Sequence, residues 1–210
     1  MFGVVLIAGV VLWVGFVWLN GGGKGSERQP IAQEFALEPL TPEIENILDN
    51  KISLVRDLVE HPTIIAEVKR ANDDHQTLSL QEILELDTRW RNAEGVDDFI
   101  KPFITNEVAL LLIEFQEDHA GFSEIFVTDV YGLNVGQTNK TTDYYQADED
   151  WWTGAYNLGM GREYHGPIEF DESAQAEAIS LYIPVIDPET STVIGVVKAV
   201  VSIAVIKMEL

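Results

Sequence analysis

The chain has 210 residues, enough for one ordinary domain with additional segments, and its hydrophobic fraction of 46% supports a buried core. Acidic residues outnumber basic ones by 35 to 13, for a formal charge of −22, which argues against a nucleic-acid partner because clustered Lys and Arg hold a phosphate backbone. The sequence contains no cysteine, which excludes disulfide bonds and thiolate metal sites.

The first segment has the pattern of a membrane span. Residues 2–19 carry no charge and would extend about 27 Å as a helix, close to the thickness of a hydrocarbon core. A cleavable signal peptide is the alternative, but the apolar run is long for one, no basic residue precedes it and no A-x-A site follows. We therefore predict a transmembrane anchor at residues 1–20 and a flexible, glycine-rich linker at residues 21–42.

Helical signals follow the linker. Thr41, Pro42 and Glu43 combine an N-cap hydroxyl, a proline at the first helical position and an acid in the first turn. Apolar residues at helical spacing then predict a long amphipathic helix at residues 42–60. His61-Pro62 interrupts this helix, because proline disfavours a helical residue before it.

Further helices are predicted before the chain changes character. One spans residues 63–71, and a second spans residues 79–90, where Ser79 and Glu82 have the spacing of a capping box. Residues 97–105 add a short helical turn. The continuous apolar run at residues 108–115 fits either a strand or a helix, and we favour a strand.

Strand and turn signals dominate the remainder. Residues 124–130 alternate and end at Tyr131-Gly132, a hairpin signal with residues 133–138 as the partner strand. A short helix is predicted at residues 148–158, and two closing strands at about 178–186 and 192–203. This order predicts an α+β fold with a long N-terminal helix and short helices packed on an antiparallel sheet, preceded by one transmembrane helix.

Four blocks, which together span residues 43–203, carry a family resemblance. They are the kinked helix with His61-Pro62, the run ending in Asp87-Thr-Arg-Trp90, the Asp129-Val-Tyr-Gly132 turn with Trp151-Trp152 after it, and Pro184-Val-Ile-Asp187 with the last strand. In these blocks the chain resembles a Cache-type extracytoplasmic sensor domain, a relative of the PAS fold found in chemoreceptors, sensor kinases and cyclases. The resemblance implies a PAS-like sheet and a single Cache module at residues 43–210.

The resemblance also implies a ligand site between the sheet and a lid of helix and loop. The amino-acid-binding branch has a Tyr, then Arg-x-Trp-Tyr-x-x-Ala, and later an Asp after a Pro-containing strand. In this chain Glu149 stands where that Arg would be, and a Glu cannot pair with a ligand carboxylate. A cationic amine or a neutral ligand therefore fits better than an amino acid held by its carboxylate. The expected ligand-binding residues are Tyr144, Glu149, Trp151, Trp152, Tyr164 and Asp187.

Structural roles compete for several of these residues. Trp151 and Trp152 point about 100° apart on a helix, so one of them is expected in the core. The acids at residues 148–150 also suit a solvated helix N-terminus, and Asp187, before a proline, also suits a turn. The spacing of the acids lacks the pattern of a calcium loop, so no metal and no cofactor is expected.

The leading functional hypothesis is a membrane-anchored, extracytoplasmic small-molecule sensor that acts in signal transduction or chemotaxis through a separate partner chain. Lys24 and Arg28 follow the span, and a strict positive-inside count would place the domain in the cytoplasm, whereas the resemblance places it in the periplasm or outside the cell. The alternative is a structural module that forms a homodimer through the helix at residues 42–60. No nucleophile elbow, P-loop or metalloprotease motif is present, so no enzymatic activity is expected.

Overall fold

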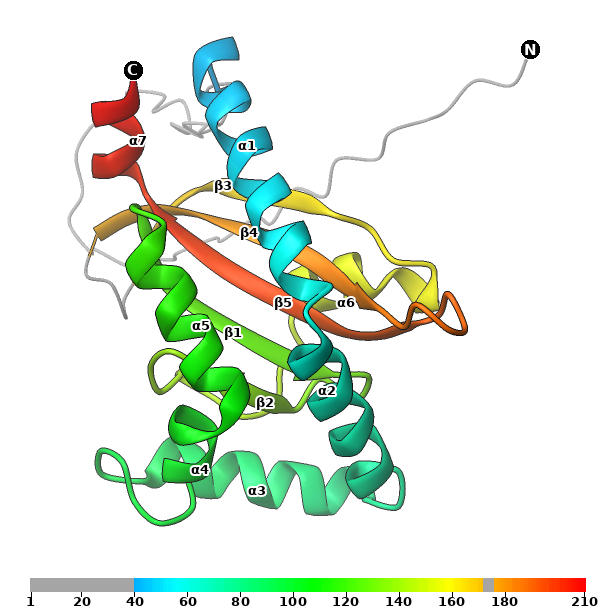
Figure 1. Cartoon of the computed structure of the whole chain (residues 1–210). Coiled ribbons are helices and arrows are strands. Elements are labelled where there is room, and N and C mark those ends of the chain that lie inside the picture. Colours follow the sequence, from blue (N-terminus) through cyan, green and yellow to red (C-terminus); the bar gives the residue numbers. More distant parts are fainter. Residues whose placement is uncertain (1–39, 172–175) are drawn as a thin grey trace, which may run out of the picture. The chain divides into compact units, whose positions relative to one another are not determined.

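The computed structural model describes residues 40–171 and 176–210, which form an α+β fold (Figure 1). The helices are α1 (Pro42–Val59), α2 (Pro62–His75), α3 (Leu80–Asn92), α4 (Lys101–Thr105), α5 (Glu107–Asp118), α6 (Asp150–Tyr156), the 3₁₀ turn η1 (Asn157–Gly159) and α7 (Ile203–Glu209). The strands are β1 (Phe122–Asp129), β2 (Asn134–Gln137), β3 (Tyr164–Asp171), β4 (Ala176–Ile186) and β5 (Val193–Ser202).

The strands form one sheet in the order β2-β1-β5-β4-β3, and every neighbouring pair is antiparallel. The last strand, β5, is therefore central, and β2 and β3 are the edges. A five-stranded antiparallel sheet with helices against it confirms the predicted α+β class and fits a PAS-like fold.

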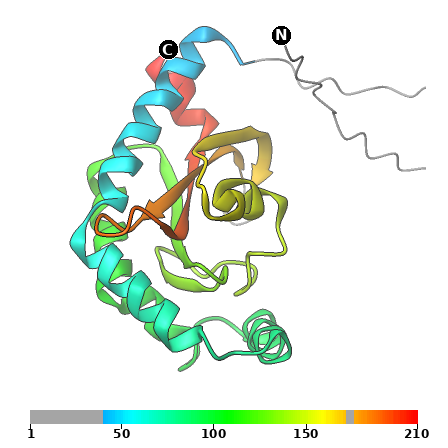
Figure 2. The same cartoon turned by 90° about the vertical axis from the view of Figure 1, so that its right-hand side faces the viewer.

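Helices cover the two faces of the sheet unequally (Figures 1 and 2). α1, α2 and α5 lie over one face, which we call the α1 face; there alternate strand residues such as Ile125, Leu181 and Val197 join the main core. The short helix α6 lies over the opposite face, which we call the α6 face, and packs on Tyr182 and Val196. Because strand residues alternate between faces, each strand contributes to both layers.

Local signals explain where the first three helices begin. The Thr41 hydroxyl accepts a hydrogen bond from the amide of Ile44, and Pro42 opens α1 as predicted. α1 ends before His61-Pro62, and the His61 ring then caps α2. The predicted capping box of α3 is present: Ser79 and Glu82 each accept a hydrogen bond from the other's amide.

The strand favoured for residues 108–115 is wrong, because these residues lie in helix α5. The side chain of Asn106 caps this helix by accepting the amide hydrogen of Ala109 at 2.8 Å. Val108, Ala109 and Leu112 form its buried side at helical spacing, whereas Leu110 is 58% exposed. An apolar residue on the outward side hides the amphipathic contrast by which a helix is recognised.

Two further elements differ from the pattern. The sequence pattern predicts no strand at residues 164–171, where β3 lies, because Gly166 and Pro167 are poor strand formers; the register shifts between His165 and Ile168. The last predicted strand, 192–203, ends at Ser202, and the short helix α7 follows.

The predicted anchor, residues 1–20, and nearly all of the predicted linker, up to residue 39, lie outside the described residues. Among residues 40–171 and 176–210, no helix has the length and the apolar character needed to cross a membrane.

Candidate functional site

One row of side chains crosses the whole α6 face. In the register of the sheet, Phe126 on β1 lies opposite Lys198 on β5, and Lys198 lies opposite Tyr182 on β4. The row continues to both edge strands, since Gln137 pairs with Phe126 and Tyr164 pairs with Tyr182. On the α6 face, Lys198 therefore lies between aromatic residues on the central strand of the sheet.

Aromatic rings surround this lysine. Lys198 Nζ lies 5.8 Å from the ring centroid of Phe126 and 5.3 Å from that of Trp151, distances that fit cation–π attraction. Trp151, on α6, stacks on Tyr182 with centroids 5.2 Å apart and an interplanar angle of 15°. None of the ion pairs among the described residues includes Lys198.

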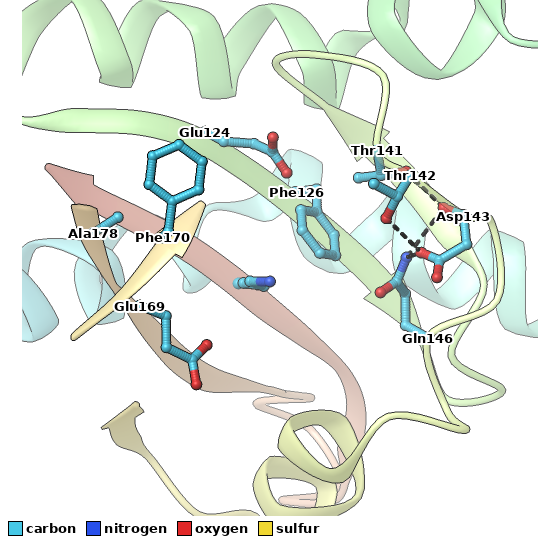
Figure 3. A pocket seen from close by; sticks show the side chains of 10 residues that line it. Glu124, Phe126, Thr141, Thr142, Asp143, Gln146, Glu169, Phe170 and Ala178 are labelled. Atoms are coloured by element: carbon cyan, nitrogen blue, oxygen red, sulfur yellow. Dashed lines mark hydrogen bonds between the residues drawn. The ribbon is translucent and has the colours of Figure 1, made fainter. Parts of the chain in front are cut away.

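A pocket of about 240 Å³ opens beside Lys198 (Figure 3). Three carboxylates line it: Glu124 from β1, Asp143 from the loop before α6, and Glu169 from β3. The other lining residues are Phe126, Thr141, Thr142, Gln146, Phe170 and Ala178. Three carboxylates against one ammonium give this pocket a negative charge at neutral pH.

Burial and nearby acids raise the pKa of two carboxyl groups beside the pocket, Asp143 and Glu149. Burial, followed by repulsion from Asp87 and Asp148, raises the pKa of Asp143, although a hydrogen bond from Gln146 acts in the opposite direction. Partial desolvation and the charges of Asp143 and Asp148 raise the pKa of Glu149, while Lys198 acts to lower it. A bound positive charge would relieve this repulsion.

Helix α3 holds the loop that forms one wall of the pocket. Asp87, only 4% exposed, accepts the amide hydrogens of Tyr144 at 2.9 Å and Tyr145 at 3.2 Å, and pairs with Arg91 at 2.6 Å. Trp90 donates its indole hydrogen to the carbonyl of Thr141 at 2.9 Å. The Asp87-Thr-Arg-Trp90 block thus positions residues 141–146 rather than contacting the pocket itself.

The structure brings three of the six expected site residues together. Trp151 stacks on Tyr182, and the Tyr164 hydroxyl donates to the Trp151 carbonyl at 2.8 Å. Glu149 precedes α6 and acts electrostatically on both Lys198 and Tyr182. Burial raises the pKa of Tyr182 to about 12, so its hydroxyl stays protonated at neutral pH.

The other three expected residues lie elsewhere. Trp152 is 4% exposed and donates its indole hydrogen to the Thr128 hydroxyl at 2.8 Å. Tyr144 is 2% exposed and stacks on Trp90 in a separate aromatic cluster, where burial raises its pKa. Asp187 starts the β4–β5 turn, where it pairs with Lys69 at 3.0 Å; hydrogen bonds from the Glu189 amide and from Lys69 lower its pKa.

Sequence reasoning missed the sheet residues of the site. Phe126, Lys198 and Tyr182 each alternate with core residues along a strand, but only the long-range register places them side by side. Two buried amides also lie on this face. Within the part of the chain that the structure describes, both side-chain polar atoms of Gln137, and Oδ1 of Asn134, lack a hydrogen-bond partner. Among residues 40–171 and 176–210, no three His, Asp or Glu side chains converge to hold a metal ion.

No family model and no curated protein matches the chain. Among solved structures, the chain is similar to the ligand-binding domain of the Campylobacter jejuni chemoreceptor Tlp3 in complex with 4-methylisoleucine (14% identity, 80% of this chain and 63% of that chain, TM-score 0.40). It is also similar to the ligand-binding domain of the Pseudomonas aeruginosa amino acid chemoreceptor PctC in complex with GABA (12%, 79% and 65%, 0.35) and to the E. coli DcuS sensor domain (16%, 61% and 92%, 0.36). The chain thus spans less than two thirds of the Tlp3 and PctC domains, and at these identities and TM-scores the function proposed below rests on the pocket's own residues.

Proposed function

We propose that the chain is a small-molecule-sensing domain that binds an organic cation, such as an amine, or a neutral ligand in the pocket of the α6 face. One observation carries this proposal: three carboxylates and aromatic rings converge around a pocket next to Lys198. Carboxylates and ring faces both attract an ammonium group, and a bound ammonium would offset the repulsion that raises the pKa of Asp143.

The size of the pocket also supports a small ligand. A volume of about 240 Å³ is slightly below the range usual for drug-sized ligands, so a compact amine fits better than a peptide. Asp143 and Glu169 supply negative charge on opposite sides of the pocket (Figure 3). Trp151 does not line the pocket, but its ring lies against Phe126 and Lys198, which do. Lys198 would repel a ligand whose positive charge lay directly over it, which favours ammonium groups placed toward the carboxylates.

The physiological setting remains part of the proposal. The span predicted at residues 2–19 would anchor the domain in the cell membrane, with the pocket in the periplasm or outside the cell, and a separate signalling chain would carry the output. A homodimer through α1 is a weaker candidate, because the apolar residues of α1 already pack in its own core and its outward residues are polar. Membrane fractionation of the full chain, with a periplasmic reporter fused after residue 210, tests the anchor and its orientation.

A thermal-shift screen tests the binding proposal. The panel contains primary amines and diamines, neutral polar compounds, amino acids and dicarboxylates, and a binder raises the melting temperature by mass action. We expect amines to give the largest shifts and dicarboxylates to give none. Shifts confined to dicarboxylates would overturn the assigned ligand class.

Two variants then locate the site. Asp143→Asn and Glu169→Gln should each weaken amine binding by about tenfold or more, since a hydrogen bond to a charged group contributes roughly 1.5–3 kcal/mol. Glu114→Gln, an exposed acid on α5 at the opposite face, is the matched control and should leave the affinity unchanged. Equal effects of all three substitutions would mean that only the net charge of the protein matters.

A further inference from the structure

Side chains at the start of β3 contact elements on both faces of the sheet. Tyr164 points to the α6 face, where its ring lies against Tyr182, with centroids 4.8 Å apart, and its hydroxyl donates to the backbone of α6. Its two neighbours in sequence, Glu163 and His165, instead bind side chains of α1. Three consecutive residues therefore contact both the aromatic rings beside Lys198 and the long helix on the other side of the sheet.

Polar side chains make both contacts with α1. Arg56 donates to the two carboxylate oxygens of Glu163, from Nε at 3.0 Å and from Nη2 at 2.5 Å, which is a bidentate pair. His165 Nε2 lies 3.0 Å from the Glu45 carboxylate, and its Nδ1 lies 2.8 Å from the Gly166 carbonyl.

The two contacts lie on one side of α1. Glu45 and Arg56 are eleven positions apart, about three helical turns, so they share a side of the helix. Between them, a pocket of about 580 Å³ separates α1 from the start of β3, lined by Asp49, Ile52, Ser53, Arg56, Arg162, Glu163, Tyr164 and His165. Side-chain bridges across a pocket, rather than close packing, thus connect these two elements, which leaves room for a relative shift.

The contact between Tyr164 and α6 is closely packed. A Cβ atom added to Gly154 of α6 would lie 2.7 Å from the Tyr164 hydroxyl oxygen, so α6 has a glycine where this ring approaches. Trp151, one turn earlier, presents its ring to the pocket side and its carbonyl to Tyr164. A displacement of α6 therefore has to displace Tyr164, because no free space separates them.

We propose that residues 163–165 form a mechanical link that transmits the position of α6, and hence the state of the pocket, to α1. A ligand that displaces Phe126 or Lys198 would displace the Trp151 ring that lies against them, and with it α6 and the Tyr164 ring. The contacts made by Glu163 and His165 would carry the shift to α1. The physiological input of this link rests on the ligand site proposed above, but the link itself is a property of the unliganded domain. By reciprocity, a change at α1 also changes the affinity of the pocket.

Gly154→Ala should displace Tyr164 without any ligand, because the added methyl group would collide with its hydroxyl. The chain lacks cysteine, so cysteines introduced at the exposed positions Asn46 on α1 and Glu114 on α5 accept nitroxide labels at defined sites. Pulsed EPR then measures the distance between the two helices in the full chain. We expect Gly154→Ala to change this distance distribution, and Tyr164→Phe, which keeps the ring but removes the hydroxyl, is a second input if the alanine variant folds poorly.

Cutting the link is the decisive step. In a background with Arg56→Met and His165→Ala, the change caused by Gly154→Ala or Tyr164→Phe should disappear. Lys69→Met removes another helix-to-sheet ion pair, to Asp187 and Glu189, and serves as the control background in which the change should persist. No change in the wild-type background, or the same change in all three backgrounds, would overturn the link.

A ligand arm separates the two proposals. If a ligand from the amine panel binds but leaves the distance unchanged, the link is wrong and the binding proposal stands. If no compound binds and Gly154→Ala still acts on α1 through Arg56 and His165, the link stands and the ligand class has to be revised.

Discussion

The two faces of the sheet differ in the side chains that they carry and in the elements that cover them. On the α1 face, Ile125, Leu181 and Val197 are fully buried beneath three helices, and apolar burial of this kind contributes roughly 25 cal/mol per Å². On the α6 face, Lys198 and Glu124 alternate with such residues, and only one short helix and a loop cover them. Charged side chains gain less from burial than apolar ones, so the α6 face contributes less to stability than the α1 face.

The largest expected effect comes from breaking the α1 face. Leu181→Ala removes a fully buried side chain and should lower the free energy of unfolding by about 2–5 kcal/mol. Leu110→Ala is the same chemical change at a 58% exposed position of α5 and should cost about 0.5 kcal/mol or less. Urea denaturation checks both, and similar losses would contradict the assignment of the core to this face.

Local signals explain which elements could be predicted from the sequence. The caps of α1 and α3 are local, since Thr41, Pro42 and the Ser79–Glu82 pair act within one turn, and these helices were predicted. The helix α5 was not, because the exposed Leu110 conceals its polar side, and β3 was not, because an edge strand tolerates Gly166 and Pro167.

The site divides in a similar way. The family resemblance and the aromatic, acidic segment predict Trp151, Tyr164 and Glu149, which lie near one another beside Lys198 and Tyr182 but do not line the pocket. Lys198 and Phe126 could not be predicted, because they become neighbours only through pairing between β1 and β5, strands separated by more than sixty residues in sequence. The sequence also does not indicate that Asp87 and Trp90 of α3 bind the loop at residues 141–146.

A smaller effect should separate the pocket loop from the rest of the fold. Asp87→Ala leaves the amides of Tyr144 and Tyr145 without their acceptor and should cost roughly 1.5–3 kcal/mol. Hydrogen exchange should accelerate in residues 141–146 before it does in β5. Asp87→Asn keeps one oxygen acceptor and should retain part of the protection; uniform acceleration through the sheet would mean that Asp87 supports the whole fold.

The covered part of the α6 face can be tested by one hydrogen bond. Trp152→Phe removes the indole donor to Thr128 and should cost about 1 kcal/mol in addition to the lost contact area. Thr128→Val removes the acceptor, and a double-mutant cycle separates this pair from the hydrogen bond that the Thr128 hydroxyl donates to the Val196 carbonyl. A coupling energy near zero would show that this contact adds no stability to the α6 layer.

The smallest expected effect concerns the charge of Asp143. Its substitution should raise the free energy of unfolding, whereas the other substitutions lower it. The pKa of Asp143 is raised in the folded state, so the native protein binds more protons than the unfolded chain between the ordinary carboxyl pKa of about 4 and the raised value. Stability contributed by the protonated group is therefore lost as pH rises through this window. Asp143→Asn cannot ionise, and it should be more stable than the wild type above the window and equal to it below.

Thermal unfolding of the two proteins at a series of pH values measures this difference. Exposed Asp118→Asn, at the end of α5, is the matched control and should show no such crossover. A ligand ammonium should reverse the order at neutral pH, because it stabilises the ionised Asp143 that the asparagine variant lacks. If the variant is less stable than the wild type at neutral pH without any ligand, the Asp143 carboxylate stabilises the fold through its hydrogen bond with Gln146. The contrast between a stabilising α1 face and a ligand-binding α6 face would then be wrong.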